Sequence, residues 1–360
     1  MTSAARASAR LGTAAALSVM LLTGCSDPPP AEEPTGEDLE RAWRIAVGDD
    51  PLDRTIAEIY SLVLNSREAP TVVVDTETAT HEAAAALAQE PGADEGDDDA
   101  DEGTDGETHE DGNASDEDSG EPEDDRYEIV LTRTLALAQT LDAEGLETLT
   151  GEGGTGPAPA AEPADLNELI TENLHDAELF TPTEATLTVS AVTTAVVAQS
   201  QEFEEDPAEG AQELTGVCDE LTVGFSEDLI DPAETVEAFY DCTPEETITA
   251  GESELVALLV EAEIDVAFIT SAHPAVHDHA LVELEDTARA FPHDQYAPVV
   301  SSRIAEEVPD VVDEISAELD TEALLTLRRL LTGQDSLTPE EAAEYWLVEE
   351  GFIAEPEHWG

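Results

Sequence analysis

The sequence contains no lysine, few aromatic residues and few cysteines. All 12 basic side chains are arginines, and they stand against 87 aspartate and glutamate residues, so the formal net charge of the 360-residue chain is −75. Nucleic-acid phosphates are bound by basic surfaces, and this balance therefore argues against a nucleic-acid partner. Acidity of this extent favours solubility in high salt. The sequence also lacks the G-x-S-x-G and P-loop patterns, so no enzymatic activity is expected.

The N-terminus has the pattern of a secretory signal. An apolar run at residues 11–22 follows two arginines and is too short to span a bilayer as a helix, so residues 1–24 are predicted to be a signal peptide. The signal ends in L-T-G-C, which resembles a bacterial lipobox and predicts a lipid on Cys25. The alternative is an ordinary signal peptide with a stray cysteine. Residues 25–41 are rich in proline and acid, and we expect them to tether the protein to the outer face of the cell membrane.

The two remaining cysteines, Cys218 and Cys242, form an even pair in a secreted chain. A disulfide between them is expected because secretion places thiols in an oxidising environment. Two buried free thiols are the alternative, since sequence spacing does not show that the Cα atoms approach each other. Two cysteines without a C-x-x-C pattern do not indicate a thiolate metal site.

Two internal segments lack a hydrophobic period. Residues 91–125 consist largely of aspartate and glutamate, and they are predicted to be disordered because like charges repel and little apolar surface can be buried. An ordered calcium site is the alternative, but the ligand spacing of a calcium-binding loop is not met. Residues 150–165, rich in glycine, proline and alanine, are predicted to be flexible.

Elsewhere, strand and helix patterns alternate along the chain. Short apolar runs predict strands at R-I-A-V-G, T-V-V-V-D, Y-E-I-V-L, T-L-T-V-S-A-V, L-T-V-G-F, I-D-V-A-F-I, V-E-L-E-D and Y-A-P-V-V. Amphipathic runs predict helices, among them one that begins with a capping box at Thr338 and Glu341. The alternation and the length of the chain predict a two-lobe α/β protein.

Residues 221–353 resemble the substrate-binding proteins of glycine betaine/choline ABC importers. The resemblance rests on the order of I-D-V-A-F-I, L-V-E-L-E-D, F-P-H-D-Q-Y-A-P-V-V, a V-P-D helix and a final T-P-E-E-A-A-E-Y-W-L-V-E-E-G-F-I. Near the N-terminus, R-I-A-V-G-D-D-P-L-D-R looks like the first strand, cleft loop and helix of the same family. The resemblance implies a type II periplasmic-binding-protein fold in which the chain crosses twice between the lobes.

The resemblance also implies domain boundaries. Lobe 1 is expected to contain residues 42–185 and, after the chain returns, 273–360. Lobe 2 is expected to contain residues 186–272, with hinges near residues 186–191 and 270–281.

The implied function is solute uptake. The lobes would close on a solute and present it to ABC permease subunits in the membrane. The implied solute is glycine betaine, choline or a similar small zwitterion or cation, and no cofactor is implied. The lipobox agrees, because Gram-positive importers anchor their binding proteins by lipid.

Several cleft positions follow from the same resemblance. The family tends to have Y-T-G-T where this chain has L-T-R-T, and T-T-D where it has T-S-A-H after the I-D-V-A-F-I strand. A quaternary ammonium is usually enclosed by aromatic faces. The candidate ligand-binding residues are Asp49, Asp50, Thr132, Arg133, Thr134, Phe225, Thr270, Ser271, His273 and Tyr296.

Four of these candidates have an alternative structural role. Phe225 and Tyr296 either face the cleft or pack in the core. Arg133 either clamps a ligand carboxylate or lies at the surface beside acids. Asp50 either attracts a cationic ligand or caps the following helix.

Two other functions stay open. His273, His277 and His279 lie close together in the sequence and suit a divalent metal, although Pro274 interrupts the helix that would align the first two. The shortage of aromatic residues also fits a binding-protein fold that has lost its transport role.

Overall fold

The computed structural model describes residues 28–31, 34–36, 38–88, 127–150, 158–201, 203, 210–227, 229, 231–332 and 336–355. The predicted signal peptide, the predicted lipid on Cys25 and the predicted disordered residues 91–125 lie outside this part of the chain. Within it, no helix combines the length and apolar character needed to cross a membrane.

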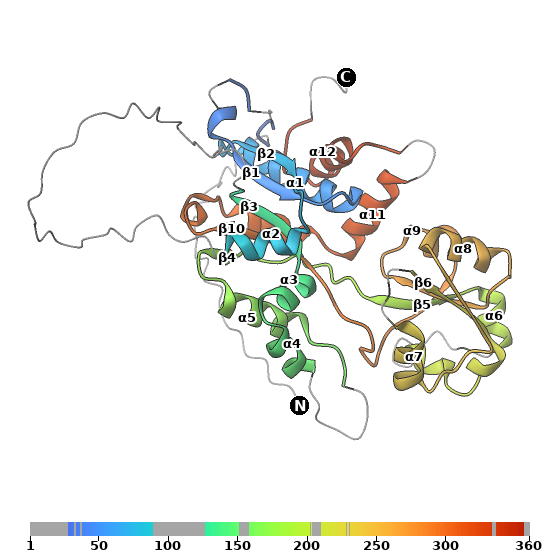
Figure 1. Cartoon of the computed structure of the whole chain (residues 1–360). Helices are drawn as coiled ribbons and strands as arrows, with labels where there is room; N and C mark the ends of the chain where they lie inside the picture. The colour runs from blue at the N-terminus through green and yellow to red at the C-terminus, as the bar shows by residue number, and fades with distance from the viewer. Residues whose placement is uncertain are drawn as a thin grey trace, which may run out of the picture.

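Two five-stranded sheets with packed helices form two lobes, so the predicted two-lobe α/β fold is confirmed (Figure 1). The strand order is β2-β1-β3-β10-β4 in lobe 1 and β7-β6-β8-β5-β9 in lobe 2. Each sheet contains one strand, β10 or β5, that is antiparallel to both of its neighbours. These are the strands that follow the two crossings between the lobes.

Lobe 1 contains the longer helices. Its strands are β1 (Trp43–Val47), β2 (Thr71–Asp75), β3 (Ile129–Arg133), β4 (Ala177–Leu179) and β10 (Tyr296–Ser301). One core cluster involves α1 (Pro51–Ser66), α10 (Val311–Glu318), α11 (Thr321–Leu331) and α12 (Pro339–Glu349). A second cluster involves α2 (Thr80–Leu87), α3 (Thr134–Leu141), α4 (Ala143–Thr150) and α5 (Pro163–Asn173). The predicted capping box of Thr338 and Glu341 begins α12.

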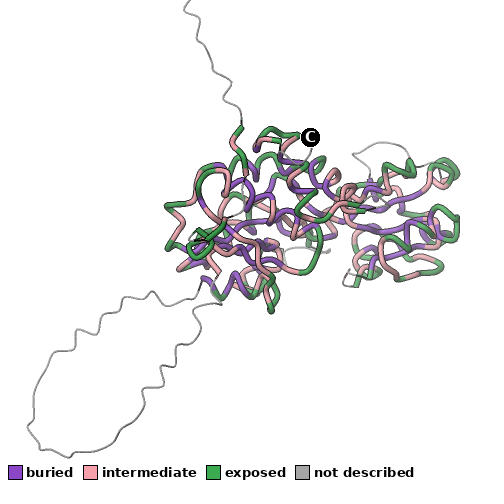
Figure 2. Tube along the Cα trace, turned by 90° about the horizontal axis from the view of Figure 1, so that it is seen from above, coloured by how far each residue is buried: buried purple, intermediate pink, exposed green. Residues whose placement is uncertain are grey.

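Lobe 2 has the same layered arrangement with shorter helices. Its strands are β5 (Val189–Thr193), β6 (Thr222–Ser226), β7 (Glu246–Ala250), β8 (Val266–Thr270) and β9 (Val282–Leu284). Its helices are α6 (Ala195–Ser200), α7 (Pro232–Tyr240), α8 (Glu252–Val260) and α9 (Pro274–Asp278). Short 3-10 helices occur at η1 (Leu39–Arg41), η3 (Gly210–Leu214), η4 (Cys218–Glu220) and η5 (Ala305–Glu307). Each lobe has its own buried interior (Figure 2).

The predicted disulfide is present in lobe 2. Cys218 and Cys242 are bonded, and their Cα atoms are 5.1 Å apart. Both side chains are buried in one core cluster of lobe 2. The bond therefore fixes the segment that contains β6 and α7.

The predicted boundary between lobe 2 and the returning chain is wrong. We expected lobe 2 to end at residue 272, but β9 pairs with β5 in the sheet of lobe 2. The V-E-L-E-D segment is thus the edge strand of lobe 2, and the predicted hinge at residues 270–281 lies inside that lobe. The second crossing follows Leu284, and a pair of backbone hydrogen bonds joins Asp294 there to Leu187 of the first crossing, at 2.7 and 2.8 Å.

Two segments expected to be irregular are partly packed on lobe 1. In the predicted tether, Ala31 contacts the core of lobe 1, and the carbonyl of Pro29 accepts a hydrogen bond of 2.9 Å from the amide of Ala354. In the predicted flexible residues 150–165, Ala161 is buried and Pro163 begins α5. Proline is favoured at the first position of a helix, so a proline in a segment that looks irregular can mark the start of a helix.

Candidate functional site

A cavity of about 420 Å³ lies between the lobes. Lobe 1 contributes residues from the loop and first turn of α1, the end of β3 and the end of α11, and lobe 2 contributes the first turn of α8 and the α9 region. Most of these segments follow the carboxyl ends of parallel strands, where α/β proteins commonly bind ligands. The charged or titratable side chains that line the cavity are Asp50, Arg133, Glu252, His273, Asp278, His279 and Arg328.

Arg133 is held against the wall of lobe 1 by two partners. Its Nη2 atom donates to the hydroxyl oxygen of Tyr296 at 2.9 Å and to Asp53 Oδ1 at 3.3 Å. The Tyr296 hydroxyl donates in turn to the same Asp53 oxygen at 2.7 Å. The guanidinium carbon also lies 4.9 Å from the centre of the Tyr296 ring, which adds a cation–π contact. Both described polar contacts use one nitrogen of a side chain that is 36% exposed, so Arg133 is oriented and still accessible.

Asp53 is the acidic member of this cluster, and its side chain is 19% exposed. Burial raises the pKa of Asp53, whereas the Arg133 guanidinium and the Tyr296 hydroxyl lower it. Asp53 is not among the residues that line the cavity, and its carboxylate orients the Arg133 guanidinium by accepting a hydrogen bond from it.

Glu252 forms the corresponding wall of lobe 2. Its Oε1 atom accepts a hydrogen bond of 2.7 Å from the amide of Thr270, and its Oε2 atom lies 3.9 Å from His273 Nε2. His273 Nδ1 accepts from the amide of Ala275 at 3.3 Å and so caps α9. Burial lowers the pKa of His273, and the Glu252 carboxylate offsets part of this effect. The imidazole is accordingly neutral near pH 7, and the wall of lobe 2 carries acidic charge.

Two arginines of α11 connect the lobes beside the cavity. Arg328 Nη1 donates to the carbonyl oxygen of Ser271 at 3.0 Å, and Arg329 lies 3.7 Å from Asp278. A separate ion pair joins Arg289, in the second crossing, to Glu162 before α5. Beside these polar contacts, Ala272 of the loop after β8 packs against the core cluster of lobe 1. Among the residues that the structure describes, the buried core residues of the two sheets belong to separate clusters.

Comparison with known families gives a match for the part of the chain that includes the lobe 2 side of the cavity. Residues 221–349 match the sequence model described as the substrate binding domain of the ABC-type glycine betaine transport system. The family consists of solute-binding components and not of enzymes, as the sequence predicts.

Solved structures extend the likeness to most of the chain. A glycine betaine/carnitine/choline ABC transporter structure has 15% identity and a TM-score of 0.62, covering 86% of this chain and 99% of its own. Ligand-free YehZ from Escherichia coli has 16% identity and a TM-score of 0.59, covering 87% of this chain and 99% of its own. At these identities the likeness concerns the fold. No curated protein sequence matches the chain.

The two lobes bring some of the predicted residues to the cavity. Asp50, Arg133 and His273 line it. Asp50 also caps α1, because its Oδ1 atom accepts from the amides of Leu52 and Asp53, so its alternative structural role is present as well. Tyr296 is 1% exposed and lies behind Arg133, which makes it a support for the arginine and not an aromatic wall.

Other predicted residues lie away from the cavity surface. Thr132 bonds to Thr80, Thr134 bonds to Asp294, and both threonines are buried. Thr270 and Ser271 contribute backbone groups to the contacts of Glu252 and Arg328. Asp49 is exposed and is not among the residues that line the cavity.

The prediction that Phe225 could face the cleft is wrong. Phe225 is 1% exposed, and its ring stacks on Phe268 with centroids 5.2 Å apart. Because β6 lies inside the sheet, with helices on both faces, a large side chain in this strand enters the core.

The histidines do not assemble a metal site. Within the described residues, no group of three or more His, Cys, Asp or Glu side chains is placed to hold a metal ion. His273 and His279 line the cavity, whereas His277 is exposed and is not among the lining residues. The short helix α9 begins at Pro274, so His273 lies in its cap and outside the helical spacing of the other two.

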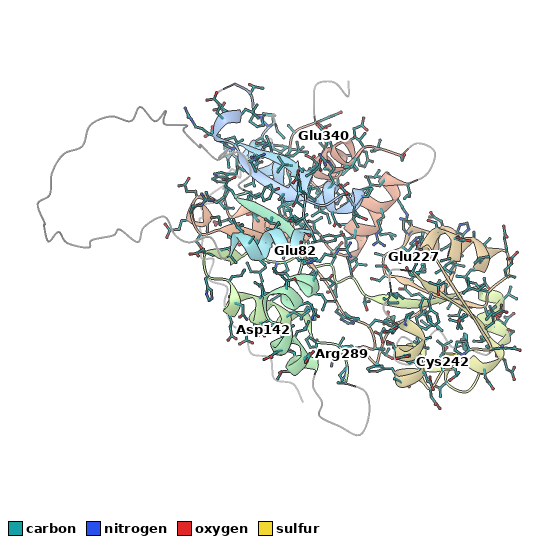
Figure 3. All side chains as sticks on the ribbon, viewed as in Figure 1. Glu82, Asp142, Glu227, Cys242, Arg289 and Glu340 are labelled. Atoms are coloured by element: carbon teal, nitrogen blue, oxygen red, sulfur yellow. A yellow bond between two sulfur atoms is a disulfide. The ribbon has the colours of Figure 1, made fainter. Side chains whose placement is uncertain are left out.

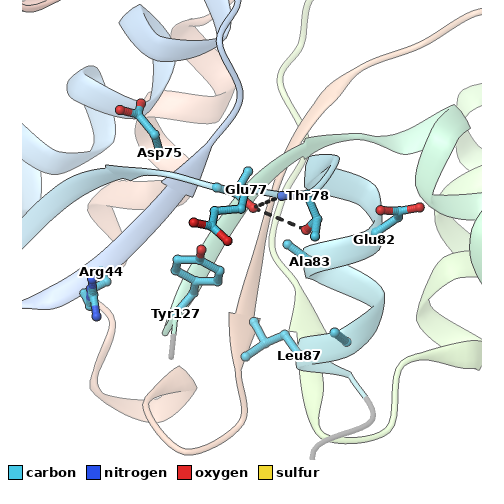
Figure 4. A pocket seen from close by; sticks show the side chains of 10 residues that line it. Arg44, Asp75, Glu77, Thr78, Glu82, Ala83, Leu87 and Tyr127 are labelled. Carbon is cyan, nitrogen blue, oxygen red and sulfur yellow. Dashed lines mark hydrogen bonds between the residues drawn. The ribbon is translucent and has the colours of Figure 1, made fainter. Parts of the chain in front are cut away.

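A further cavity of about 610 Å³ lies in lobe 1 beside α2 (Figure 4). Its wall includes Asp75, Glu77, Glu82, Arg44 and Tyr127. The cavity contains none of the predicted ligand-binding residues, and the acids around it belong to the end of β2, the loop that follows it and the start of α2.

Three residues of the interlobe site were not predicted from the sequence. Asp53 and Glu252 are acids in the first turn of a helix, and Arg328 is a base in the last turn. Such placements are ordinary complements of the helix dipole, so they carry no sequence signal of a ligand site.

Proposed function

We propose that the protein is the solute-binding component of an ABC importer and captures a small zwitterionic or cationic solute between its lobes. Glycine betaine, choline and carnitine are the first solutes to test. The closed protein delivers the solute to permease subunits, and a lipid on Cys25 retains it at the outer face of the membrane. The family match of residues 221–349 supports the importer role.

The observation that carries the proposal is the charged cavity between the lobes. It has a volume of about 420 Å³, which lies within the size range of small-molecule sites. Arg133 offers guanidinium donors to a carboxylate, and Glu252 offers a carboxylate to a cation. A zwitterion complements both groups at once.

Lobe closure is the expected mechanism of capture. Two crossing segments joined by the bridge between Leu187 and Asp294 are suited to a rotation of one lobe against the other. Closure around a solute removes water from the cavity, which strengthens the contacts between opposite charges. Arg328 of lobe 1 already donates a hydrogen bond to the backbone of lobe 2 at Ser271, so the two lobes are in contact beside the cavity.

Isothermal titration calorimetry on the purified full chain tests this function. We expect saturable binding of at least one of the three solutes, and Arg133→Ala should weaken it roughly tenfold or more, as for loss of a hydrogen bond between charged groups. Arg67→Ala is the matched control, since Arg67 is an exposed arginine at the opposite end of α1.

Three results would contradict the proposal. Equal affinities in Arg133→Ala and Arg67→Ala would exclude the interlobe cavity as the site. Absence of binding by any zwitterion or cation to a well-folded sample would favour a fold that has lost its transport role, and a response to zinc alone would favour the histidines.

A further inference from the structure

We infer that the cationic end of the solute bears N–H donors, as a primary or secondary ammonium or a guanidinium does, and that it binds the acidic wall of lobe 2 at Glu252 while its carboxylate binds Arg133 of lobe 1. This inference rests on the proposed function and narrows its substrate class and the orientation of the solute.

The first argument is the absence of an aromatic surface at the cavity. No tryptophan, tyrosine or phenylalanine is among the described residues that line it. The aromatic rings of lobe 2 that lie nearest in sequence to the cleft loops, Phe225, Phe268 and Phe291, pack against one another in the core. The ring of Tyr296 is covered by the guanidinium of Arg133. A quaternary ammonium donates no hydrogen bond and is bound best by aromatic faces, which this cavity does not offer.

The second argument is the separation of charge across the cavity. Lobe 1 contributes Arg133 and Arg328, and lobe 2 contributes Glu252 and Asp278. Asp50 is the acid on the lobe 1 side, and its Oδ1 atom is engaged by the amides of the first turn of α1. A zwitterion between these walls is therefore oriented with its carboxylate toward lobe 1.

The acidic wall of lobe 2 continues beyond the interlobe cavity. A neighbouring cavity of about 650 Å³ shares Glu252 and His273 with it and adds Glu227 and Glu254. Glu227 lies on the side of lobe 2 that faces lobe 1 (Figure 3). These acids create a negative potential around the cationic end of a solute, which raises the local concentration of cations.

Glu252 is preorganised for an N–H donor. The hydrogen bond from the Thr270 amide to Oε1 fixes the carboxylate, and Oε2 remains directed toward the His273 side of the cavity. An N–H group that donates to this carboxylate gains a charge-assisted hydrogen bond. A trimethylammonium group makes no such bond, and it still removes water from the carboxylate, which opposes binding.

A methylation series tests the inference by calorimetry on the full chain. The ligands are glycine betaine, N,N-dimethylglycine, sarcosine and glycine, together with γ-aminobutyrate and its N-trimethyl analogue, and guanidinoacetate. We expect at least one N–H-bearing member to bind roughly tenfold or more tightly than its trimethyl counterpart, as for one hydrogen bond to a charged group. Glu252→Gln should abolish this preference, while Glu237→Gln, an exposed acid on α7 of the same lobe, should preserve it.

The outcomes separate this inference from the proposed function. Tighter binding of the trimethyl member of each pair, or an unchanged preference in Glu252→Gln, overturns the inference and leaves the solute-binding role intact. Failure of every quaternary and N–H-bearing solute to bind overturns the proposed function itself. The melting temperature of each variant shows whether an altered preference arises from the site or from unfolding.

Discussion

Tyr296→Phe should destabilise lobe 1 more than Tyr60→Phe does. Both tyrosines are buried, at 1% and 3% exposure, and both rings pack in the same core cluster. The Tyr296 hydroxyl donates to the carboxylate of Asp53 at 2.7 Å, whereas the Tyr60 hydroxyl shares a 2.8 Å hydrogen bond with the neutral Ser316 hydroxyl. A hydrogen bond to a charged group contributes about 1.5–3 kcal/mol, and one between neutral groups about 0.5–1.5 kcal/mol. We therefore expect Tyr296→Phe to cost about 1 kcal/mol more at pH 7.

The difference between the two variants should depend on pH. Burial raises the pKa of Asp53 above its ordinary value, and the Tyr296 hydroxyl lowers it, so Tyr296→Phe raises this pKa further. A carboxyl group whose folded-state pKa is raised makes the folded state less stable as pH rises above the unfolded value of 3.8. The extra cost of Tyr296→Phe should consequently be full at pH 7 and shrink as the pH falls toward 4.

Urea unfolding of the full chain at several pH values, without solute, measures both effects. Circular dichroism and intrinsic fluorescence should be followed together, because two lobes can unfold in separate steps. Equal costs for the two variants at pH 7, or a difference that is the same at every pH, would refute an ionised Asp53 hydrogen-bonded to Tyr296.

Two further perturbations concern lobe 2. Replacing Cys218 and Cys242 together by serine should lower the free energy of unfolding of lobe 2 by about 3 kcal/mol, because the bond closes a loop with a sequence separation of 24; an unchanged urea midpoint would contradict this. Gly224→Ala should cost about 1–3 kcal/mol by overpacking, since a Cβ atom there would lie 2.7 Å from Leu255 and 2.8 Å from Ile264. Gly48→Ala, where the nearest side-chain atom is 3.6 Å away, is the control and should change thermal stability much less.

The strands that could be predicted are those with continuous apolar runs. The segments that became β1, β3, β6, β8 and β10 are interior strands of the two sheets, so their sequences are rich in apolar and β-branched residues. The edge strand β2 could also be predicted, because it contains three consecutive valines. The strand β7 was not predicted, because it forms an edge of the sheet of lobe 2 and alternates mainly exposed and half-buried residues. Edge strands of this kind carry a weak hydrophobic signal.

Part of the site could be predicted, since the candidate ligand-binding residues Asp50, Arg133 and His273 line the cavity. Arg133 stands where the family tends to have glycine, and the structure confirms that it lines the cavity. Asp53 and Glu252 could not be distinguished among the 87 acids of the chain, because an acid in the first turn of a helix is common. Their role depends on tertiary contacts with Arg133 and with the backbone of β8, which join residues far apart in the sequence.

The first crossing between the lobes has little free chain. The amide of Ala185 donates to the carbonyl of Leu319 in lobe 1 at 2.8 Å, and the carbonyl of Thr188 accepts from the amide of Ser271 in lobe 2 at the same distance. Only residues 186 and 187 lie between these attachments. We therefore expect the change in backbone angles on closure to concentrate there, at the start of the predicted hinge at residues 186–191.

The second crossing, which follows Leu284, has a similarly short stretch between its last two anchors. Phe291 is buried in the core of lobe 2, and Asp294 is fixed to lobe 1 because its side chain accepts from the Thr134 hydroxyl at 3.1 Å and from the Leu135 amide at 2.9 Å. Pro292 and His293 alone lie between these two anchors, and proline has a restricted φ angle. Two short hinges joined by the bridge between Leu187 and Asp294 are suited to a rotation of one lobe against the other. Such a rotation changes the distance between Arg133 and Glu252, the two groups that we expect to hold opposite ends of the solute.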